Sequence, residues 1–259
     1  MDLTLKNKTA LVTGASRGIG KAIALTLAKQ GVNLILTARS TDSLNLTLAE
    51  AEKFGIKGKV FSCDFAKKSE VGNLISQVKN HSQIDILINN AGIAESYPLL
   101  KTSFEEWQRH FAVNVDSTFL LTQAFISEMA VKKWGRIVNV ASTAGKVGYA
   151  YTAAYTASKH ALLGLTKVAA LEFAKKGVTV NAVCPSFVNT EIVSKSIQKI
   201  NETTGMKEDK ARETLSRLSP QNRLLETQEI ADLTVFLCSK EAKGITGQGI
   251  NIDGGTLTF

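Results

Sequence analysis

Tyr155 and Lys159, in the segment Tyr-Thr-Ala-Ser-Lys, form the pair in this sequence best suited to proton transfer. On a helix, residues four apart lie on one face. A phenol has a pKa of about 10, too high for proton exchange near neutrality, and a nearby ammonium group lowers it. Such a pair can exchange a proton with an alcohol or carbonyl oxygen. A surface tyrosine beside a surface lysine is the alternative, and Tyr149 and Tyr151 have no lysine four residues later.

A glycine-rich turn near the start of the chain has the composition of a phosphate-binding site. Gly14-Ala-Ser-Arg-Gly18-Ile-Gly20 follows a short apolar run and opens a helical pattern. Glycines at such a junction let the backbone approach a pyrophosphate, and the N–H groups and dipole of the helix favour the anion. The spacing differs from the usual G-x-G-x-x-G, and an ordinary strand–helix turn is the alternative. Its position at the first junction favours a dinucleotide.

The end of the next apolar run indicates which dinucleotide is bound. A site for NAD usually carries an acid about twenty residues beyond the glycines, which bonds the ribose 2′-hydroxyl. Here Ala38-Arg39-Ser40 stands at that place, and Asp42 comes later. The guanidinium groups of Arg39 and of Arg17 in the glycine turn suit a 2′-phosphate. We therefore expect NADP(H) rather than NAD(H); two solvated surface arginines are the alternative.

The elements that must position these residues alternate along the chain. Apolar runs predict seven strands, at 9–12, 33–38, 59–63, 84–89, 136–142, 178–183 and 249–252. Helical patterns occupy 18–30, a stretch ending near 54, 70–81, 107–129, 155–175 and 230–237. This alternation predicts an α/β fold, a parallel sheet with helices on both faces. Residues 190–222 break the alternation; they are polar, helix-prone and long for a connection, so we expect a lid over a site.

Several polar residues fall at the ends of the predicted strands. Ser142 ends one strand, and Asn89-Asn90-Ala91-Gly92 ends another. Ligand sites in doubly wound sheets form beyond the carboxyl ends of the strands, so these segments should meet the glycine turn. Asn114 lies inside a long helical pattern, where asparagine is unfavourable. A specific hydrogen-bonding role is expected for it, and an exposed helix position is the alternative.

Together, TGASRGIG at 13–20, NNAG at 89–92, Asn114, Ser142, YTASK at 155–159 and GQGINIDGG at 247–255 resemble the short-chain dehydrogenase/reductase family over essentially the whole chain. The resemblance implies a single Rossmann-type domain over residues 1–259, with a doubly wound sheet, and usually a homotetramer. It implies that Ser142 orients a substrate carbonyl and that Tyr155 protonates its oxygen. Lys159 would bind the nicotinamide ribose and tune Tyr155, and Asn114 would hold a water in a proton relay to Lys159.

The resemblance also implies the residues around the cofactor. Asp64 would contact adenine and Thr190 the carboxamide. The whole expected set, with no metal ligand among them, is Gly14, Ser16, Arg17, Gly18, Ile19, Gly20, Arg39, Asp64, Asn90, Ala91, Gly92, Tyr155, Lys159, Pro185, Val188 and Thr190. In one departure from the family pattern, Pro185-Ser186 stands where Pro-Gly is usual, so a side chain is expected to narrow the pocket or bond the carboxamide.

The substrate is less well defined. The stretch 155–190 resembles 3-oxoacyl-thioester and polyketide ketoreductases and also 3-hydroxybutyrate dehydrogenases, and the long 190–222 segment favours the latter. Ala94, Ala144 and Thr152 stand where those dehydrogenases use polar residues for a carboxylate. We therefore expect a neutral ketone or a 3-oxoacyl thioester of an acyl carrier or coenzyme A. An NAD(H)-dependent hydroxy-acid or alcohol dehydrogenase and a non-catalytic dinucleotide-binding regulator remain alternatives.

Composition limits the partners and the location. The 259 residues are 44% apolar and 21% charged, as in an ordinary globular protein. The net charge of +8 indicates either a solvated lysine-rich surface or attraction for a polyanion such as a phosphorylated acyl carrier. No basic stretch is interleaved with aromatics, so nucleic acid is not expected. Three cysteines without a metal or CxxC spacing, no signal peptide and no membrane-length apolar run predict a cytoplasmic protein with reduced thiols.

Overall fold

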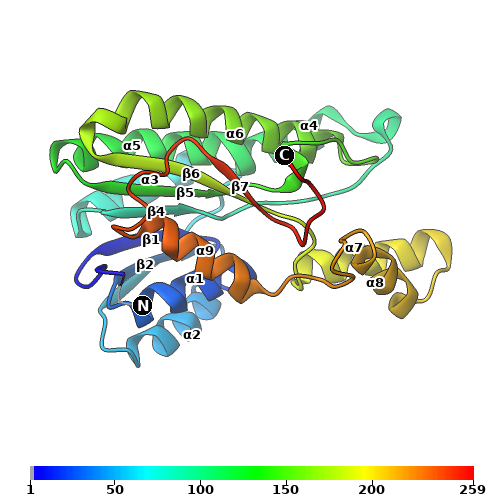
Figure 1. The fold of residues 1–259 in the computed structure, drawn as a ribbon, viewed down its shortest axis with the longest axis horizontal. Helices are drawn as coiled ribbons and strands as arrows, with labels where there is room; N and C mark the ends of the chain where they lie inside the picture. Colours follow the sequence, from blue (N-terminus) through cyan, green and yellow to red (C-terminus); the bar gives the residue numbers. More distant parts are fainter. Residues whose placement is uncertain (1–2) are drawn as a thin grey trace.

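The computed structural model describes residues 3–259 (Figure 1). Met1 and Asp2, which begin the segment expected to contain no signal peptide, lie outside the described residues. Within residues 3–259, all strands form one parallel sheet in the order β3-β2-β1-β4-β5-β6-β7. The strands are β1 (Thr9–Thr13), β2 (Asn33–Ala38), β3 (Gly58–Ser62), β4 (Ile86–Asn89), β5 (Gly135–Val140), β6 (Val178–Pro185) and β7 (Gly249–Ile252). The predicted number of strands and their parallel direction are confirmed.

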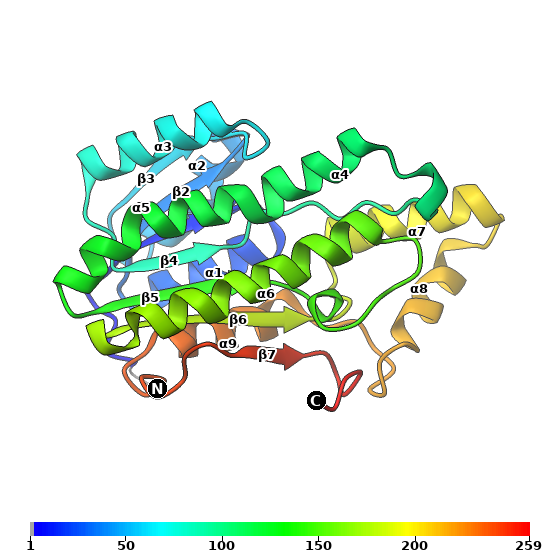
Figure 2. The ribbon, with the colours of Figure 1, turned by 90° about the horizontal axis from the view of Figure 1, so that it is seen from above.

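Helices cover both faces of the sheet (Figures 1 and 2). One layer contains α1 (Gly18–Lys29), α2 (Thr41–Glu52) and α9 (Thr227–Cys238), and the other contains α3 (Lys68–His81), α4 (Phe104–Phe111), α5 (Ser117–Val131) and α6 (Ala153–Phe173). Short 3-10 turns η1 (Leu99–Lys101), η3 (Thr143–Gly145) and η4 (Ala174–Lys176) join some of these elements. The central strands are apolar on both sides because each face packs under helices.

The predicted uniform helix at 107–129 is wrong in its internal structure. The helix begins earlier, at Phe104, because the Ser103 hydroxyl accepts a hydrogen bond from the Glu106 N–H at 3.2 Å and caps the first turn. A π-helical turn, η2 (Ala112–Asp116), separates α4 from α5. Single π turns inside α-helices often mark functional sites, and this turn contains Asn114.

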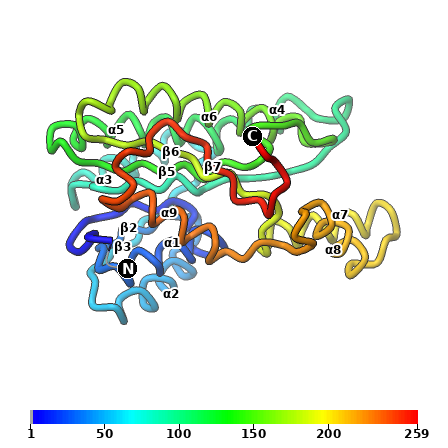
Figure 3. Tube along the Cα trace, viewed as in Figure 1, coloured from blue at the N-terminus to red at the C-terminus, as the bar shows by residue number. Residues whose placement is uncertain are grey.

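The 190–222 stretch contains two helices, α7 (Glu191–Thr204) and α8 (Glu208–Ser216), that we call the α7–α8 segment. It projects beyond the sheet and its covering helices (Figures 1 and 3). Its own small apolar cluster joins the two helices, with Val193, Ile197, Ala211 and Leu215 at its centre. The segment therefore depends on few contacts with the rest of the protein.

Cys63, Cys184 and Cys238 are buried and unpaired, as the prediction of reduced thiols requires. Within residues 3–259, every helix is too short or too polar to cross a membrane.

The carboxyl ends of β1 and β4, where the strand order reverses, are tied together by one threonine. The Thr13 hydroxyl accepts hydrogen bonds from the N–H groups of Asn90 and Ala91, both at 2.9 Å, and donates to the Ile88 carbonyl at 3.3 Å. The Asn90 amide in turn donates to the carbonyl oxygens of Thr13 and Gly14, at 2.9 and 3.2 Å. These bonds fix the glycine turn against the 89–92 segment.

Replacing Thr13 by valine should lower the free energy of unfolding by about 1 to 3 kcal/mol, because two N–H groups lose their acceptor. Thr37 is the matched control: it pairs with Thr13 in the neighbouring strand, and its buried hydroxyl has no hydrogen-bond partner within residues 3–259. Thr37→Val should leave stability unchanged or raise it. Urea unfolding measures both variants, and equal losses would contradict the assignment.

Candidate active site

One pocket of about 770 Å³ runs along the carboxyl edge of the sheet. It is lined by every residue that sequence analysis placed at the site except Asn114: Gly14, Ser16, Arg17, Gly18, Ile19, Gly20, Arg39, Asp64, Asn90, Ala91, Gly92, Ser142, Tyr155, Lys159, Pro185, Val188 and Thr190. They meet because they follow the ends of parallel strands that share one edge.

The glycine turn has the shape of a phosphate cradle. Gly14 and Gly18 have φ angles of 65° and 55°, which favour glycine. A Cβ on Gly20 would lie 2.2 Å from the Gly14 carbonyl oxygen, so the turn closes too tightly for any side chain there. The turn leads into α1, whose N-cap residue Arg17 forms no side-chain cap. The N–H groups of that first turn therefore remain available for an anion.

The two arginines expected at a 2′-phosphate differ in their surroundings. Arg39 follows β2 directly, is exposed at the pocket, and makes no ion pair or side-chain hydrogen bond with the residues from 3 to 259. The Arg17 guanidinium instead forms an ion pair with Glu191, the first residue of α7. Arg39 is therefore the more available cation at this end of the pocket.

Lys159 is a buried, positively charged residue at the other end of the pocket. Its side chain and that of Tyr155 extend from one face of α6, with the ammonium 5.7 Å from the centre of the phenol ring. Lys159 is only 5% exposed, and its ammonium donates a hydrogen bond to the Val140 carbonyl at 2.8 Å. Burial lowers the pKa of Lys159 from 10.5 to about 8, because the charged form loses its hydration.

The pKa of Tyr155 shifts in the direction opposite to the expected one. We expected the lysine to lower the pKa of the phenol, but burial raises the pKa of Tyr155, and hydrogen bonding with Ser142 opposes that rise. The expected net lowering is wrong because desolvation of the phenolate outweighs the stabilising contacts. Tyr155 consequently keeps its proton at neutral pH, the state required of a proton donor.

Ser142 connects the ends of β5 and β6. It precedes the η3 turn, and its hydroxyl accepts a hydrogen bond from the Ala144 N–H at 3.1 Å and donates to the Pro185 carbonyl at 3.4 Å. Ser186, the first residue after β6, lines the pocket, and its backbone lies outside the left-handed region that would favour glycine. The backbone here accommodates the serine that departs from the family pattern.

Asn114 lies behind the pocket and is 1% exposed, so the alternative of an exposed helix residue is wrong. Its amide accepts a hydrogen bond from the Ile93 N–H at 2.9 Å and donates to the Ile93 carbonyl at 3.0 Å and the Ser158 hydroxyl at 2.9 Å. A Cβ on Gly92 would lie 3.2 Å from the Asn114 oxygen and 3.7 Å from the Lys159 nitrogen. The glycine thus keeps side-chain atoms out of the space between them.

Further pocket residues were not anticipated, among them Ile93, Arg109, Val113 and Glu191. Ile93 and Glu191 directly follow predicted site residues, so extending those motifs by one position would have found them. Arg109 belongs to α4 and Val113 to the π turn, and that turn decides which side chains of this stretch point into the pocket. The spacing of residues in the sequence does not indicate the turn.

Comparison with known proteins places the chain in a family. A family model described as enoyl-(acyl carrier protein) reductase matches residues 14–257. The chain is 38% identical to the D-beta-hydroxybutyrate dehydrogenase of Cupriavidus necator, covering 97% of this chain and 98% of that protein. It is 35% identical to the 3-oxoacyl-(acyl-carrier-protein) reductase of Aquifex aeolicus, over 98% and 99%. The crystal structure of a variant of actinorhodin polyketide ketoreductase with NADPH is similar, with a TM-score of 0.92, 32% identity and 98% coverage of both chains.

These matches span nearly the whole chain and agree with the fold and the motifs. The chain belongs to the short-chain dehydrogenase/reductase family of oxidoreductases.

Proposed function

We propose that the chain is an NADP(H)-dependent reductase that converts a ketone, or the 3-oxo group of an acyl thioester, to a secondary alcohol. The observation that carries the proposal is a protonated phenol and a buried lysine at one end of a pocket whose other end is a phosphate cradle. NADPH, when bound, would supply the hydride.

The residues of the chain supply position and a proton. The hydroxyl groups of Tyr155 and Ser142 would hydrogen-bond the substrate oxygen and stabilise its developing negative charge. Because its pKa is raised, Tyr155 remains protonated until the oxygen becomes basic enough to take the proton. Lys159, with a pKa of about 8, exchanges protons readily near neutrality and would resupply Tyr155. The protonated Tyr155 is the form needed for the reductive direction.

Three observations support NADPH as the cofactor. Arg39 is an exposed, unpaired cation at the end of β2 within the described chain, where the 2′-phosphate of the cofactor would lie. The similar actinorhodin ketoreductase variant was crystallised with NADPH. No carboxylate stands at that strand end to select NAD(H).

The pocket favours an uncharged carbonyl compound. Ala94 lines it, and the pocket-lining cation of α4, Arg109, pairs with Glu95 at 3.4 Å and Glu106 at 3.3 Å. A free carboxylate would have to compete with two carboxylates for that guanidinium. An NAD(H)-dependent hydroxy-acid dehydrogenase is the second candidate, because a D-beta-hydroxybutyrate dehydrogenase is 38% identical to this chain. A non-catalytic regulator would need neither the protonated phenol nor the buried lysine.

We infer that the substrate is carried by an acyl carrier or coenzyme A, because a phosphorylated carrier fits the basic net charge. We also infer that the protein is a homotetramer in the cytoplasm. Exposed apolar side chains on α5 and α6, among them Phe119, Val168 and Leu171, fit subunit contacts.

Tyr155→Phe should reduce turnover at least about 100-fold, because the variant has no proton to donate. The assay is NADPH oxidation with acetoacetyl-CoA and neutral ketones, and NADPH binding followed by fluorescence should be unchanged. Tyr151→Phe is the matched control, since Tyr151 is 65% exposed and has no lysine partner. Full turnover by the Tyr155 variant would defeat the mechanism. Activity confined to NADH and hydroxy acids would favour the second candidate.

Arg39→Ala should raise KM for NADPH by about 10- to 100-fold, the value of a lost charge-assisted hydrogen bond, and leave KM for NADH unchanged. Arg217→Ala, an exposed site on the α7–α8 segment, is the control. Steady-state kinetics with both cofactors measures the ratio. An unaltered preference for NADPH would remove Arg39 from this role.

A further inference from the structure

Helix α7 carries part of the pocket but is weakly attached to the rest of the protein. Ile192 and Val193, in its first turn, line the pocket. The helix packs chiefly against α8. Within the described chain, two polar side-chain contacts join α7 to the sheet and the elements that cover it. One is the Arg17–Glu191 ion pair, and the other is the contact of Lys199 with the β4–α4 loop. Lys199 therefore provides one of these two polar side-chain links.

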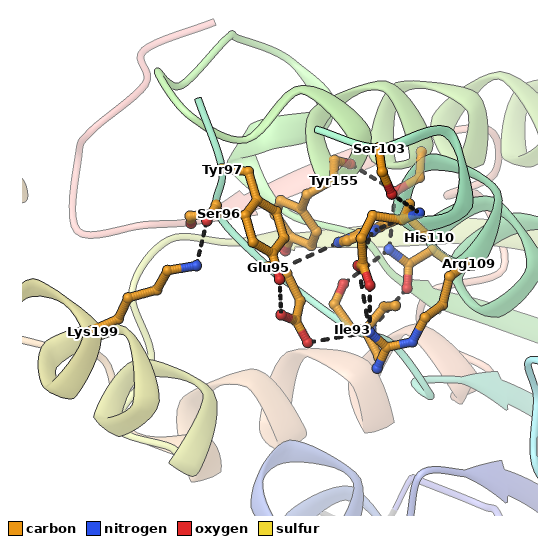
Figure 4. A network of polar contacts seen from close by, with 12 residues as sticks. Ile93, Glu95, Ser96, Tyr97, Ser103, Arg109, His110, Tyr155 and Lys199 are labelled. Atoms are coloured by element: carbon orange, nitrogen blue, oxygen red, sulfur yellow. Dashed lines mark hydrogen bonds and ion pairs between the residues drawn. The ribbon is translucent and has the colours of Figure 1, made fainter. Parts of the chain in front are cut away.

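Lys199 contacts two uncharged groups. Its ammonium donates a hydrogen bond to the Ser96 carbonyl and lies 4.1 Å from the centre of the Tyr97 ring (Figure 4). A cation over an aromatic face is attracted by the ring quadrupole. Tyr97 is held in place at both ends. Its hydroxyl donates a hydrogen bond to the Glu95 carboxylate at 3.2 Å, and its backbone N–H donates to the Tyr151 carbonyl at 2.8 Å.

The loop that receives Lys199 is fixed from its other side. The Glu95 N–H donates to the Nε2 of His110 at 3.2 Å, and the His110 Nδ1 lies 2.8 Å from the Glu106 carbonyl (Figure 4). In the first contact the His110 Nε2 is the acceptor, and the second contact fits a proton on Nδ1. His110 is 1% exposed. Together with the bonds of Asn114 to Ile93, these contacts fix the loop 93–97, whose first two residues, Ile93 and Ala94, line the pocket.

We propose that Lys199 is the latch that holds α7 against this loop and thereby keeps Ile192 and Val193 over the substrate end of the pocket. It is a positioning residue: it acts through α7 and does not touch the reacting atoms. The inference rests on the proposed function in that the closed compartment is the one that holds the carbonyl substrate. A closed pocket retains substrate and excludes water. Loss of the latch should therefore weaken substrate binding and leave proton transfer by Tyr155 intact.

The test compares two lysines of the same helix. Lys199→Met keeps the apolar side chain and removes the charge. Lys195→Met is the matched control, because Lys195 lies one turn earlier, is exposed and has no partner within residues 3–259. For Lys199→Met we expect KM for the ketone to rise about 3- to 30-fold, from the strength of a cation–π contact, with kcat and KM for NADPH within about twofold of wild type. Lys199→Arg should restore KM.

Two ketones distinguish a latch from a binding site for an anion. KM for neutral ethyl acetoacetate and for anionic acetoacetyl-CoA should rise alike. A rise confined to acetoacetyl-CoA, or equal KM values for the Lys199→Met and Lys195→Met variants, would overturn the proposal. Tyr97→Leu should raise KM as Lys199→Met does, and combining the two changes should add little, since both remove one contact.

Hydrogen exchange tests the latch without catalysis. Amides of 191–204 should exchange faster in Lys199→Met than in wild type or Lys195→Met, while exchange in α6 stays unchanged as a check on folding. If the wild-type protein reduces no ketone, the proposed function fails, and this measurement still decides the latch. Equal exchange in all three proteins would overturn it.

Discussion

The site depends on burying one ammonium group. Lys159 is placed by α6 where the carboxyl ends of the central strands meet, with the Val140 carbonyl as its hydrogen-bond acceptor and, within residues 3–259, no carboxylate to pair with. A buried charge without a counter-ion is costly and is retained where its chemistry is needed. Because of this cost, the pKa of Lys159 is lowered to about 8, close to the pH at which the proposed mechanism exchanges a proton.

The surrounding residues hold Lys159 and Tyr155 in these positions. Asn114, in the π turn between α4 and α5, fixes the loop after β4, and Gly92 leaves room beside the ammonium. Ser142 connects the ends of β5 and β6 beside Tyr155. The same burial that shifts the lysine keeps the phenol protonated. In the proposed mechanism both groups donate protons, and the cofactor would supply the hydride.

Much of this arrangement is predictable from the sequence because parallel strands share one edge. Seven apolar runs mark the strands, and motifs at their ends must converge, so the strand-end part of the pocket was predicted, whereas residues contributed by α2, α4, η2 and α7 were not. The π turn at 112–116 was not predictable, because the one-residue shift that it makes in the apolar spacing is too small to distinguish from ordinary irregularity in a long helix. The direction of the Tyr155 shift depends on burial, which spacing does not encode. Substrate choice stays open because relatives with different substrates are similarly identical to this chain.

The pH dependence of stability in wild type and Lys159→Met tests the buried charge most directly, with exposed Lys167→Met as control. The folded-state pKa of about 8 lies below the ordinary 10.5, so the wild-type protein bears the cost of the charge below pH 8 and loses it as pH rises towards 10.5. The Lys159 variant should be more stable than wild type by about 1 to 3 kcal/mol at pH 7, and the difference should shrink between pH 8 and 10. A difference that is absent, or that stays constant with pH, would contradict the account.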